Sequence, residues 1–257
     1  MPSSSPSPSN SNNSDRHSPS SSNYTITHHA QMERTHNTNG EGSSSSSASV
    51  NLEILSREEA RQTIVASLVQ ILEQPLAMLR DGTVGDQQMK AESRLIPGSS
   101  LGKHLRHVHD HYRVLLDSIE SSKRKGGEEA IELDYDKRTR VVPLETSGKV
   151  ALEEFESTIE RIQKLFNQKQ SQGAFWDLHL DRPIRLFATT PAEIELGSSL
   201  GREMWFVCLH AIHHYALARV ILVHELGLRI NDSFGVAPST MVMRLWRQAS
   251  SQEKSKL

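Results

Sequence analysis

The sequence predicts an all-α protein, an antiparallel four-helix bundle with a short hairpin before the last long helix. Four stretches of the chain carry apolar residues at the three- and four-residue spacing of one helical face. Two of these stretches also carry histidines at or next to the apolar face. Because helical bundles commonly build ligand and metal sites between facing helices, this combination favours a bundle with a site inside it.

The composition predicts one soluble domain with extensions. The chain has 257 residues, 29 basic and 31 acidic side chains and a formal charge of −2, so we expect neither a nucleic-acid nor a membrane partner. No uninterrupted apolar run of about 18 residues is present. Cys208 is the sole cysteine, which excludes an intramolecular disulfide; we expect a buried, inert thiol.

The two ends of the chain differ in composition from its middle. Residues 1–50 are rich in Ser, Asn, Thr and Pro, with the run Ser43 to Ser47, and predict a disordered region without a secretory signal. Residues 51–245 are expected to form the helical domain, and residues 246–257 a flexible tail.

The last three residues are Ser255, Lys256 and Leu257. At a free C-terminus this tripeptide is read by the peroxisomal import receptor. We therefore expect a peroxisomal location, and a cytoplasmic one if the match is accidental.

The first predicted helix begins after Ser56, a typical N-cap residue, and runs to about Arg80. Glu58 and Glu59 lie in its first turn, where carboxylates suit the positive end of the helix dipole. Pro75 is expected to kink or end it. Its apolar stripe is Ile64, Leu68, Ile71 and Leu72.

The second predicted helix begins near Ser100, after a connecting loop at residues 81–97. Its heptad stripe predicts that a full face packs against partner helices. The stripe is Leu101, Leu105, Val108, Tyr112, Leu115 and Ile119. The same helix carries His104, His107, His109 and His111.

The pattern lapses between Ser121 and Ser147, and a third helix is predicted from Lys149 to about Gln170, closed by Gly173. Its apolar positions are Leu152, Phe155, Ile159, Ile162 and Phe166. Residues 175–180 and 184–189 flank an Asp181-Arg182-Pro183 turn signal and are expected to pair as the hairpin.

The fourth predicted helix, from Leu200 to Leu226 after the cap Ser199, poses the main chemical question. Its core-facing spacing is followed by Val207, His210, His214, Leu217 and Ile221. Burying an imidazole without a partner costs on the order of 1 to 3 kcal/mol. The two rings therefore predict either a hydrogen-bond network or a shared metal ion.

His210 and His214 are four residues apart, so both can reach one ion at about 2.0 to 2.1 Å. A third ligand from the second helix would leave positions open for water or substrate, as in catalytic metal sites. The heptad direction places His104 and His111 nearer the core than His107. The alternative is a metal-free network in which Asp110, Glu203 and backbone carbonyls satisfy the rings.

Two segments carry a resemblance to a known family: SSLGKHLRHVHDHY and, far downstream, HAIHHYALARVIL. Together they resemble the DinB superfamily of four-helix metalloproteins, also called DinB/YfiT-like metalloenzymes. YDKRTR in the middle of the chain and FGVAPST after the last helix extend the match, which covers roughly residues 56–240. FGVAPST is typical of one branch of that family.

The resemblance implies a divalent metal, Zn, Ni or Fe, bound by His107, His210 and His214. His111 is the first substitute for His107, and His213 is expected to support the ligands. Glu203 is a candidate for a carboxylate that orients a ligand ring, although its place near a helix N-terminus explains it equally well.

The resemblance also implies a metal-dependent enzyme of thiol S-transferase or hydrolase type that acts on a small-molecule substrate, with a low-molecular-weight thiol as a further cofactor. Related bundles are often homodimers. The alternative hypothesis is a non-catalytic metal- or ligand-binding module that serves a protein partner. Arg138 and Arg140 are candidates for binding an anionic substrate, or for pairing with Asp134 and Asp136.

Overall fold

The computed structural model describes residues 55–127, 129–137, 142–166, 178–237 and 240. Several predictions lie outside these residues. They are the disordered region at 1–50, the tail at 246–257 with its terminal Ser255, Lys256 and Leu257, the loop arginines Arg138 and Arg140, and the end of the third helix near Gln170 and Gly173.

The described residues are mainly helical and include one small sheet, so the predicted all-α class is correct only in its main part. The helices are α1 (Arg57–Glu73), α2 (Leu76–Arg80), α3 (Asp86–Lys90), α4 (Leu101–Arg124), α5 (Val142–Thr146), α6 (Gly148–Phe166), α7 (Leu200–Arg219) and the π-helical η1 (Val220–Glu225). The strands are β1 (Ile131–Asp134), β2 (Pro183–Ala188) and β3 (Ile194–Ser199).

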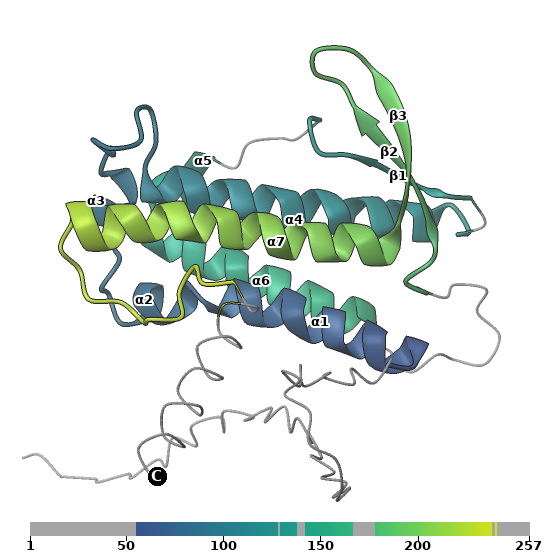
Figure 1. The fold of residues 1–257 in the computed structure, drawn as a ribbon, viewed down its shortest axis with the longest axis horizontal. Helices are drawn as coiled ribbons and strands as arrows, with labels where there is room; N and C mark the ends of the chain where they lie inside the picture. The colour runs from purple at the N-terminus through teal and green to yellow at the C-terminus, as the bar shows by residue number, and fades with distance from the viewer. Residues whose placement is uncertain (1–54, 128, 138–141, 167–177, 238–239, 241–257) are drawn as a thin grey trace, which may run out of the picture. The chain divides into compact units, whose positions relative to one another are not determined.

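The four long helices α1, α4, α6 and α7 pack side by side as a bundle, with α4 against α7 and α6, and α1 against the same two helices (Figure 1). Two neighbouring pairs, α4 with α7 and α1 with α6, are antiparallel as predicted. The pairs α4 with α6 and α1 with α7 are parallel. Helix α6 begins at the same end of the bundle as α4, because α5, which precedes α6, packs against the start of α4, where Gly102 lies against the Glu145 carbonyl. The predicted antiparallel arrangement is therefore wrong for these two pairs.

Helix α1 begins where its capping residues predict. The Ser56 hydroxyl accepts a hydrogen bond from the Glu59 amide, and the Glu59 carboxylate accepts one from the Ser56 amide. The helix ends at Glu73, and Pro75 separates it from α2. The prediction that Pro75 interrupts the first helix is thus confirmed.

Helix α4 begins after Ser100, whose hydroxyl accepts a hydrogen bond from the Lys103 amide. All six residues of its predicted stripe are buried. Burial extends beyond the stripe, because α4 contacts α5, α6, α7 and β1. The additional buried side chains are His104, His109, Asp110, His111, Val114 and Leu116.

The predicted hairpin exists, but its strands are different ones. Strand β2 corresponds to the second predicted strand, at residues 184–189, and pairs antiparallel with β3 at residues 194–199. Leu178 to Leu180, in the first predicted strand, form no strand. The polar end of β3, Gly197 to Ser199, resembles a loop in sequence and becomes a strand through its backbone pairing with β2.

Strand β1 lies parallel to β2, so the sheet has the order β1-β2-β3 and joins the segment after α4 to the segment before α7. Arg185 on the central strand forms ion pairs with Glu132 on β1 and with Glu195 on β3. This cross-strand pairing was not predicted, because the partners lie 53 and 10 residues away in sequence.

The fourth predicted helix is confirmed as α7 and η1, and the Ser199 hydroxyl caps it by accepting from the Arg202 amide. By length and average composition, the segment Leu200–Glu225 is the one described helix that could cross a membrane. It packs against α4 and α1 within the bundle, which accounts for its apolar residues.

The first two residues of the FGVAPST segment, Phe234 and Gly235, pack against the end of the bundle, and its Pro238 and Ser239 lie outside the described residues. The Phe234 ring stacks on Tyr215 with ring centroids 5.1 Å apart, and the Gly235 amide donates to the Gln74 side chain. Gly235 has φ of +68° and lies against the Tyr215 backbone, so a side chain there would be strained and would collide. The motif is thus a structural anchor for the end of α7.

Gly102 lies where α4 passes under α5, and a Cβ atom there would collide with the Glu145 carbonyl and lie 2.9 Å from the Met89 carbonyl. We predict that Gly102→Ala lowers the free energy of unfolding by about 1 to 3 kcal/mol, although alanine favours helix. Denaturant unfolding followed by circular dichroism measures this.

Gly197→Ala is the matched control, because nothing lies within 4 Å of its Cβ position. It should leave the unfolding midpoint within error of wild type. Equal stability of Gly102→Ala and wild type would contradict the close approach of α4 and α5.

Candidate metal centre

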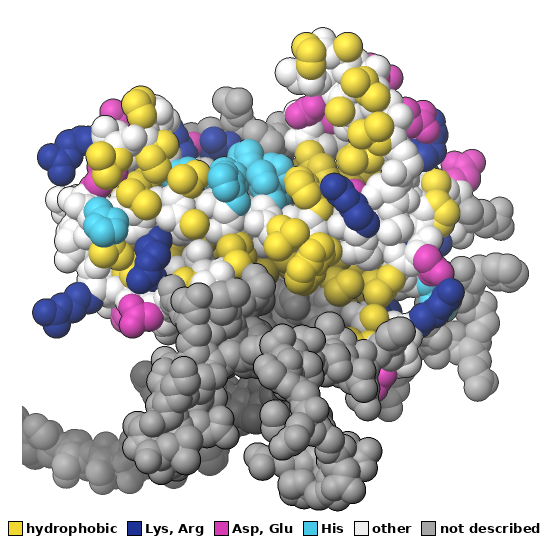
Figure 2. Space-filling model, viewed as in Figure 1, with side chains coloured by type: hydrophobic (Ala, Val, Ile, Leu, Met, Phe, Trp, Pro, Cys, Tyr) yellow, Lys and Arg dark blue, Asp and Glu magenta, His cyan; other side chains and the backbone are white. Residues whose placement is uncertain are grey.

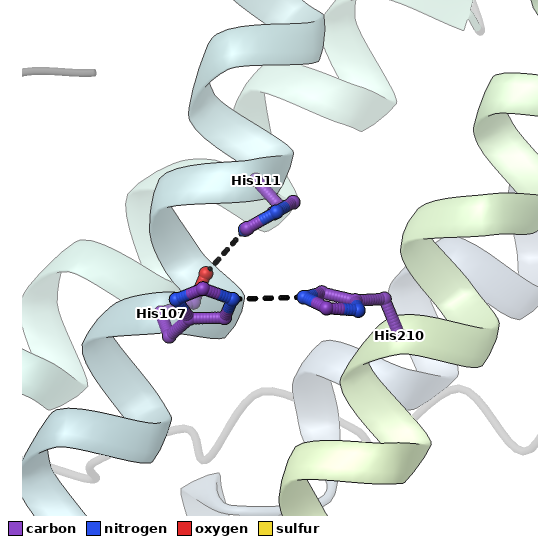
Figure 3. Close-up of side chains that lie close together, drawn as sticks. All are labelled: His107, His111 and His210. Atoms are coloured by element: carbon purple, nitrogen blue, oxygen red, sulfur yellow. Dashed lines mark hydrogen bonds between the residues drawn. The ribbon is translucent and has the colours of Figure 1, made fainter. Parts of the chain in front are cut away.

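Helices α4 and α7 bring together three histidines whose ligand atoms lie within 4.8 Å of one another (Figure 3). His107 and His111 are one turn apart on α4, and His210 faces them from α7. Helices α4 and α7 lie side by side, so one ring on α7 can lie opposite two rings that are one turn apart on α4. These three residues are placed so that they could hold a metal ion.

The ring of His111 has a defined protonation pattern. Its Nδ1 lies 2.8 Å from the backbone carbonyl oxygen of His107, and since a carbonyl can only accept, Nδ1 carries the proton and donates it. In the neutral ring Nε2 therefore carries the lone pair. A ligating histidine commonly has its other nitrogen held in this way, so His111 is ready to bind through Nε2.

His107 and His210 face each other through their Nε2 atoms, which are 2.8 Å apart. Without an ion, one of the two nitrogens donates to the other. Two nitrogens bound to one tetrahedral ion at about 2.0 to 2.1 Å would be about 3.3 Å apart. An ion could therefore take the place of the shared proton if the two rings moved about half an ångström apart and turned their lone pairs toward it.

His214, the third ligand implied by the family resemblance, lies beside this group and has a different partner. Its Nδ1 is 2.9 Å from Nδ1 of His104, and the other nitrogen of His104 is 2.7 Å from the Ser99 hydroxyl. The His214 ring centroid is still only 4.2 Å from that of His107 and 4.7 Å from that of His210. The histidines on the two helices thus form a continuous row of rings, the histidine row, made up of His104, His214, His107, His210 and His111.

Burial keeps part of this row uncharged. It lowers the pKa of His104, with a further contribution from His213, and it lowers the pKa of His214 to about 3, with further contributions from His210 and His104. Both rings are therefore neutral at pH 7. Neutral imidazole is the form that binds metals.

The histidine row reaches the surface. His107, His210 and His214 are partly exposed and His213 is exposed, whereas His104 and His111 are buried. Figure 2 shows histidine side chains at the surface between hydrophobic groups. His213 packs edge-on against His214, as expected of a supporting residue. Solvent and a small molecule therefore have access to the site.

A partly buried tyrosine and a fully buried glutamate support the site, and only the glutamate was expected from the sequence. Tyr135, which follows β1, stacks on His111 with ring centroids 5.1 Å apart and an angle of 22°. Its hydroxyl donates to Glu203, whose fully buried carboxylate also accepts from Ser198 and Arg202. Glu203 therefore acts on His111 through Tyr135. No sequence signal predicts this link across 68 residues.

Two other predicted candidates face away from the site. His109 is buried between α4 and α6, with Nε2 3.4 Å from the Glu154 carboxylate. Asp110 is fully buried and pairs with Arg106 and Arg113 on its own helix. In the metal-free alternative, the histidine rings therefore hydrogen-bond to one another, to Ser99 and to a backbone carbonyl. Among the described residues, Glu203 hydrogen-bonds to Tyr135, Ser198 and Arg202 instead.

A separate groove of about 510 Å³ lies between the second half of α4 and β1, and it contains no histidine. Its lining is strongly charged, with Arg113, Asp117 and Asp134 among the residues that form it. The groove and the histidine group thus lie at different places on the surface. The candidate metal centre is the histidine group, because it carries the ligand atoms.

Two tyrosines, Tyr135 and Tyr215, provide a matched pair of substitutions. The Tyr135 hydroxyl donates to buried Glu203, whereas among the described residues the buried Tyr215 hydroxyl has no hydrogen-bond partner. We predict that Tyr135→Phe lowers the free energy of unfolding by about 1 to 3 kcal/mol and that Tyr215→Phe leaves it unchanged or raises it. Thermal unfolding of both variants decides this, and equal losses would contradict it.

Cys208 is buried beneath the histidine row, and the Tyr112 hydroxyl lies 3.7 Å from its sulfur. Burial raises the pKa of its thiol to about 12, so the reactive thiolate is scarce at neutral pH. We predict that an aromatic disulfide reagent modifies Cys208 slowly in the native protein and rapidly in guanidinium. Stoichiometric modification of the native protein within minutes would show that the thiol is not enclosed.

Comparison with known proteins gives one partial similarity. Over 113 residues, 42% of this chain, it is 39% identical to FK506-binding protein 5 of Rhizopus delemar. The chain spans only about a quarter (26%) of that protein's length. No family model and no solved structure matches the chain. The similarity does not bear on the resemblance to the DinB superfamily, which stays a prediction.

Proposed function

We propose that this chain is a DinB-like divalent-metal-binding protein and a metal-dependent enzyme of thiol S-transferase or hydrolase type. The observation that carries the proposal is the group His107, His111 and His210, whose ligand atoms lie within 4.8 Å of one another at a surface-accessible seam. Three imidazoles suit Zn, Ni or Fe. The partial exposure of His107 and His210 favours an enzyme over a sealed structural site.

The geometry favours His111 as the third ligand, with His214 as the alternative that the family resemblance implies. Nδ1 of His111 donates to a carbonyl, so the neutral ring would bind through Nε2. The ligand atoms of His111 lie within 4.8 Å of those of His107 and His210, and His214 is not part of that group. His214 would then stand beside the ion as a neutral ring that can accept a proton or a hydrogen bond from a bound substrate.

The residues around the site would keep it rigid. Tyr135 stacks on His111, and Phe206 stacks on His210 with ring centroids 5.3 Å apart. An ion bound to neutral histidines would lower the pKa of a bound water or thiol and so produce a nucleophile at neutral pH. The exposed side of the row would receive the second substrate.

We predict that the full-length protein binds one divalent ion per chain and that His210→Ala and His111→Ala each weaken binding on the order of 100-fold. His214→Ala should weaken it less, because His214 is not one of the three residues whose ligand atoms lie within 4.8 Å of one another. His224→Ala, an exposed histidine at the end of η1, is the control and should bind as wild type. Calorimetric titration with Zn²⁺ and Ni²⁺ measures all four.

A greater loss in His214→Ala than in His111→Ala would assign the third ligand as the family resemblance implies. Absence of any bound metal, with no thermal shift on adding Zn²⁺, Ni²⁺ or Fe²⁺, would refute the metal site. Turnover is then tested on the metal-loaded protein with thiol and electrophile pairs and with ester and amide substrates. Activity retained in His210→Ala would refute the proposed mechanism.

A further inference from the structure

Three side chains form a continuous stack along α7 that leads away from the candidate metal centre. They are Arg202, Phe206 and His210, each one helical turn from the next. The Arg202 guanidinium carbon lies 5.1 Å above the Phe206 ring, and the Phe206 and His210 rings stack at 5.3 Å with 22° between their planes. One face of the helix thus joins a cation, an aromatic surface and a metal-binding ring.

Arg202 is held in place and still accessible. Its Nη1 donates to Glu203 at 2.7 Å, and the Glu203 carboxylate is fully buried and fixed by Tyr135 and Ser198. The Arg202 side chain is 59% exposed. Among the described residues its hydrogen bonding uses Nη1, so the N–H groups of Nε and Nη2 remain for a second carboxylate or a similar anion.

The surface around this stack is apolar. Trp205 and Leu209 on α7 are 45% and 46% exposed, and Ile194 and Leu196 on β3 are about half exposed. Phe206 also packs against Tyr135, with ring centroids 5.4 Å apart. Figure 2 shows hydrophobic side chains on the hairpin and along α7 next to the histidines, with a basic side chain beyond them. Exposed apolar groups next to a polar site are typical of ligand-binding surfaces.

We propose that the substrate of this site is an amphipathic anion, with a carboxylate bound by Arg202, an apolar segment on Phe206 and a thiol or other metal-binding end at His210. This inference rests on the metal-dependent function proposed above. Arg202 and His210 are eight residues apart, which corresponds to about 12 Å along a helix. A substrate with a chain of about eight carbons spans that length.

The test uses the full-length protein loaded with Co²⁺ and two probes of equal length, mercaptooctanoate and mercaptooctanol, each with the thiol at the far end of the chain. A thiolate bound to Co²⁺ gives a sulfur-to-metal charge-transfer band, so each titration reports thiol binding directly. We expect the acid to bind about ten-fold more tightly than the alcohol in wild type, because only the acid pairs with Arg202.

Two variants separate the role of Arg202 from folding. Arg202→Gln combined with Glu203→Gln removes the cation without leaving a buried charge unpaired, and it should bind acid and alcohol equally. Arg229→Gln, which removes an exposed arginine after η1, should keep the ten-fold preference. Both should retain the helical circular dichroism spectrum. The readout is the ratio of acid to alcohol affinity within each variant, because a change in the support that Glu203 gives to His111 through Tyr135 would alter the binding of both thiols alike.

The outcomes distinguish the two proposals. Equal dissociation constants for acid and alcohol in wild type, with a charge-transfer band for both, would overturn the assignment of Arg202 and leave the metal site standing. A preference that persists in the double variant would overturn it as well. If neither thiol produces a band in Co²⁺-loaded protein, the thiol-binding function and the inference built on it both fail.

Discussion

The packing of α4 against α7 is the constraint on which the rest of the structure depends. It brings imidazole rings from both helices to one seam, where leucines would otherwise fill the space. A desolvated ring nitrogen without a partner is costly, so these nitrogens are satisfied in specific pairs: His107 with His210, His104 with His214, and His111 with a carbonyl. The first two pairs fix the relative position of the two helices along the seam, whereas the third lies within α4.

The parallel arrangement of α4 and α6 follows from the chain that joins them. That chain contributes β1, which adds to the hairpin formed by β2 and β3, and α5, which packs against α4 and α6. The same segment places Tyr135 over His111 and within hydrogen-bond distance of Glu203. The small sheet is thus part of the support of the histidine site, because it connects the segment after α4 to the first turn of α7.

The site combines rigidity on its inner side with access on its outer side. Glu203 is fully buried and holds Tyr135 against His111, whereas His107 and His210 are partly exposed and Arg202 extends into solvent from the same helix as His210. A structural metal site is normally enclosed by four protein ligands. An exposed seam with three suitable rings, an aromatic surface and a fixed cation supports the proposal that a small substrate binds across it.

The sequence alone predicted the elements that depend on local pattern. Ser56, Ser100 and Ser199 cap their helices as expected, the heptad stripe of α4 is buried, and His107 and His210 face each other from the two helices that were expected to carry the site. These features follow from helical periodicity and from side-chain bonds between residues a few positions apart. The place of His111 beside His107 also follows from a spacing of four.

Tertiary structure decided the remainder, because those features depend on pairing between distant segments. The strands of the hairpin, its union with β1 and the parallel course of α6 follow from backbone hydrogen bonds and chain connection, which polar strand residues such as Gly197 and Ser198 do not reveal. The partner of His214 was decided in the same way. Helical spacing places His214 on the face of His210, but only the position of α4 brings His104 close enough to engage its Nδ1.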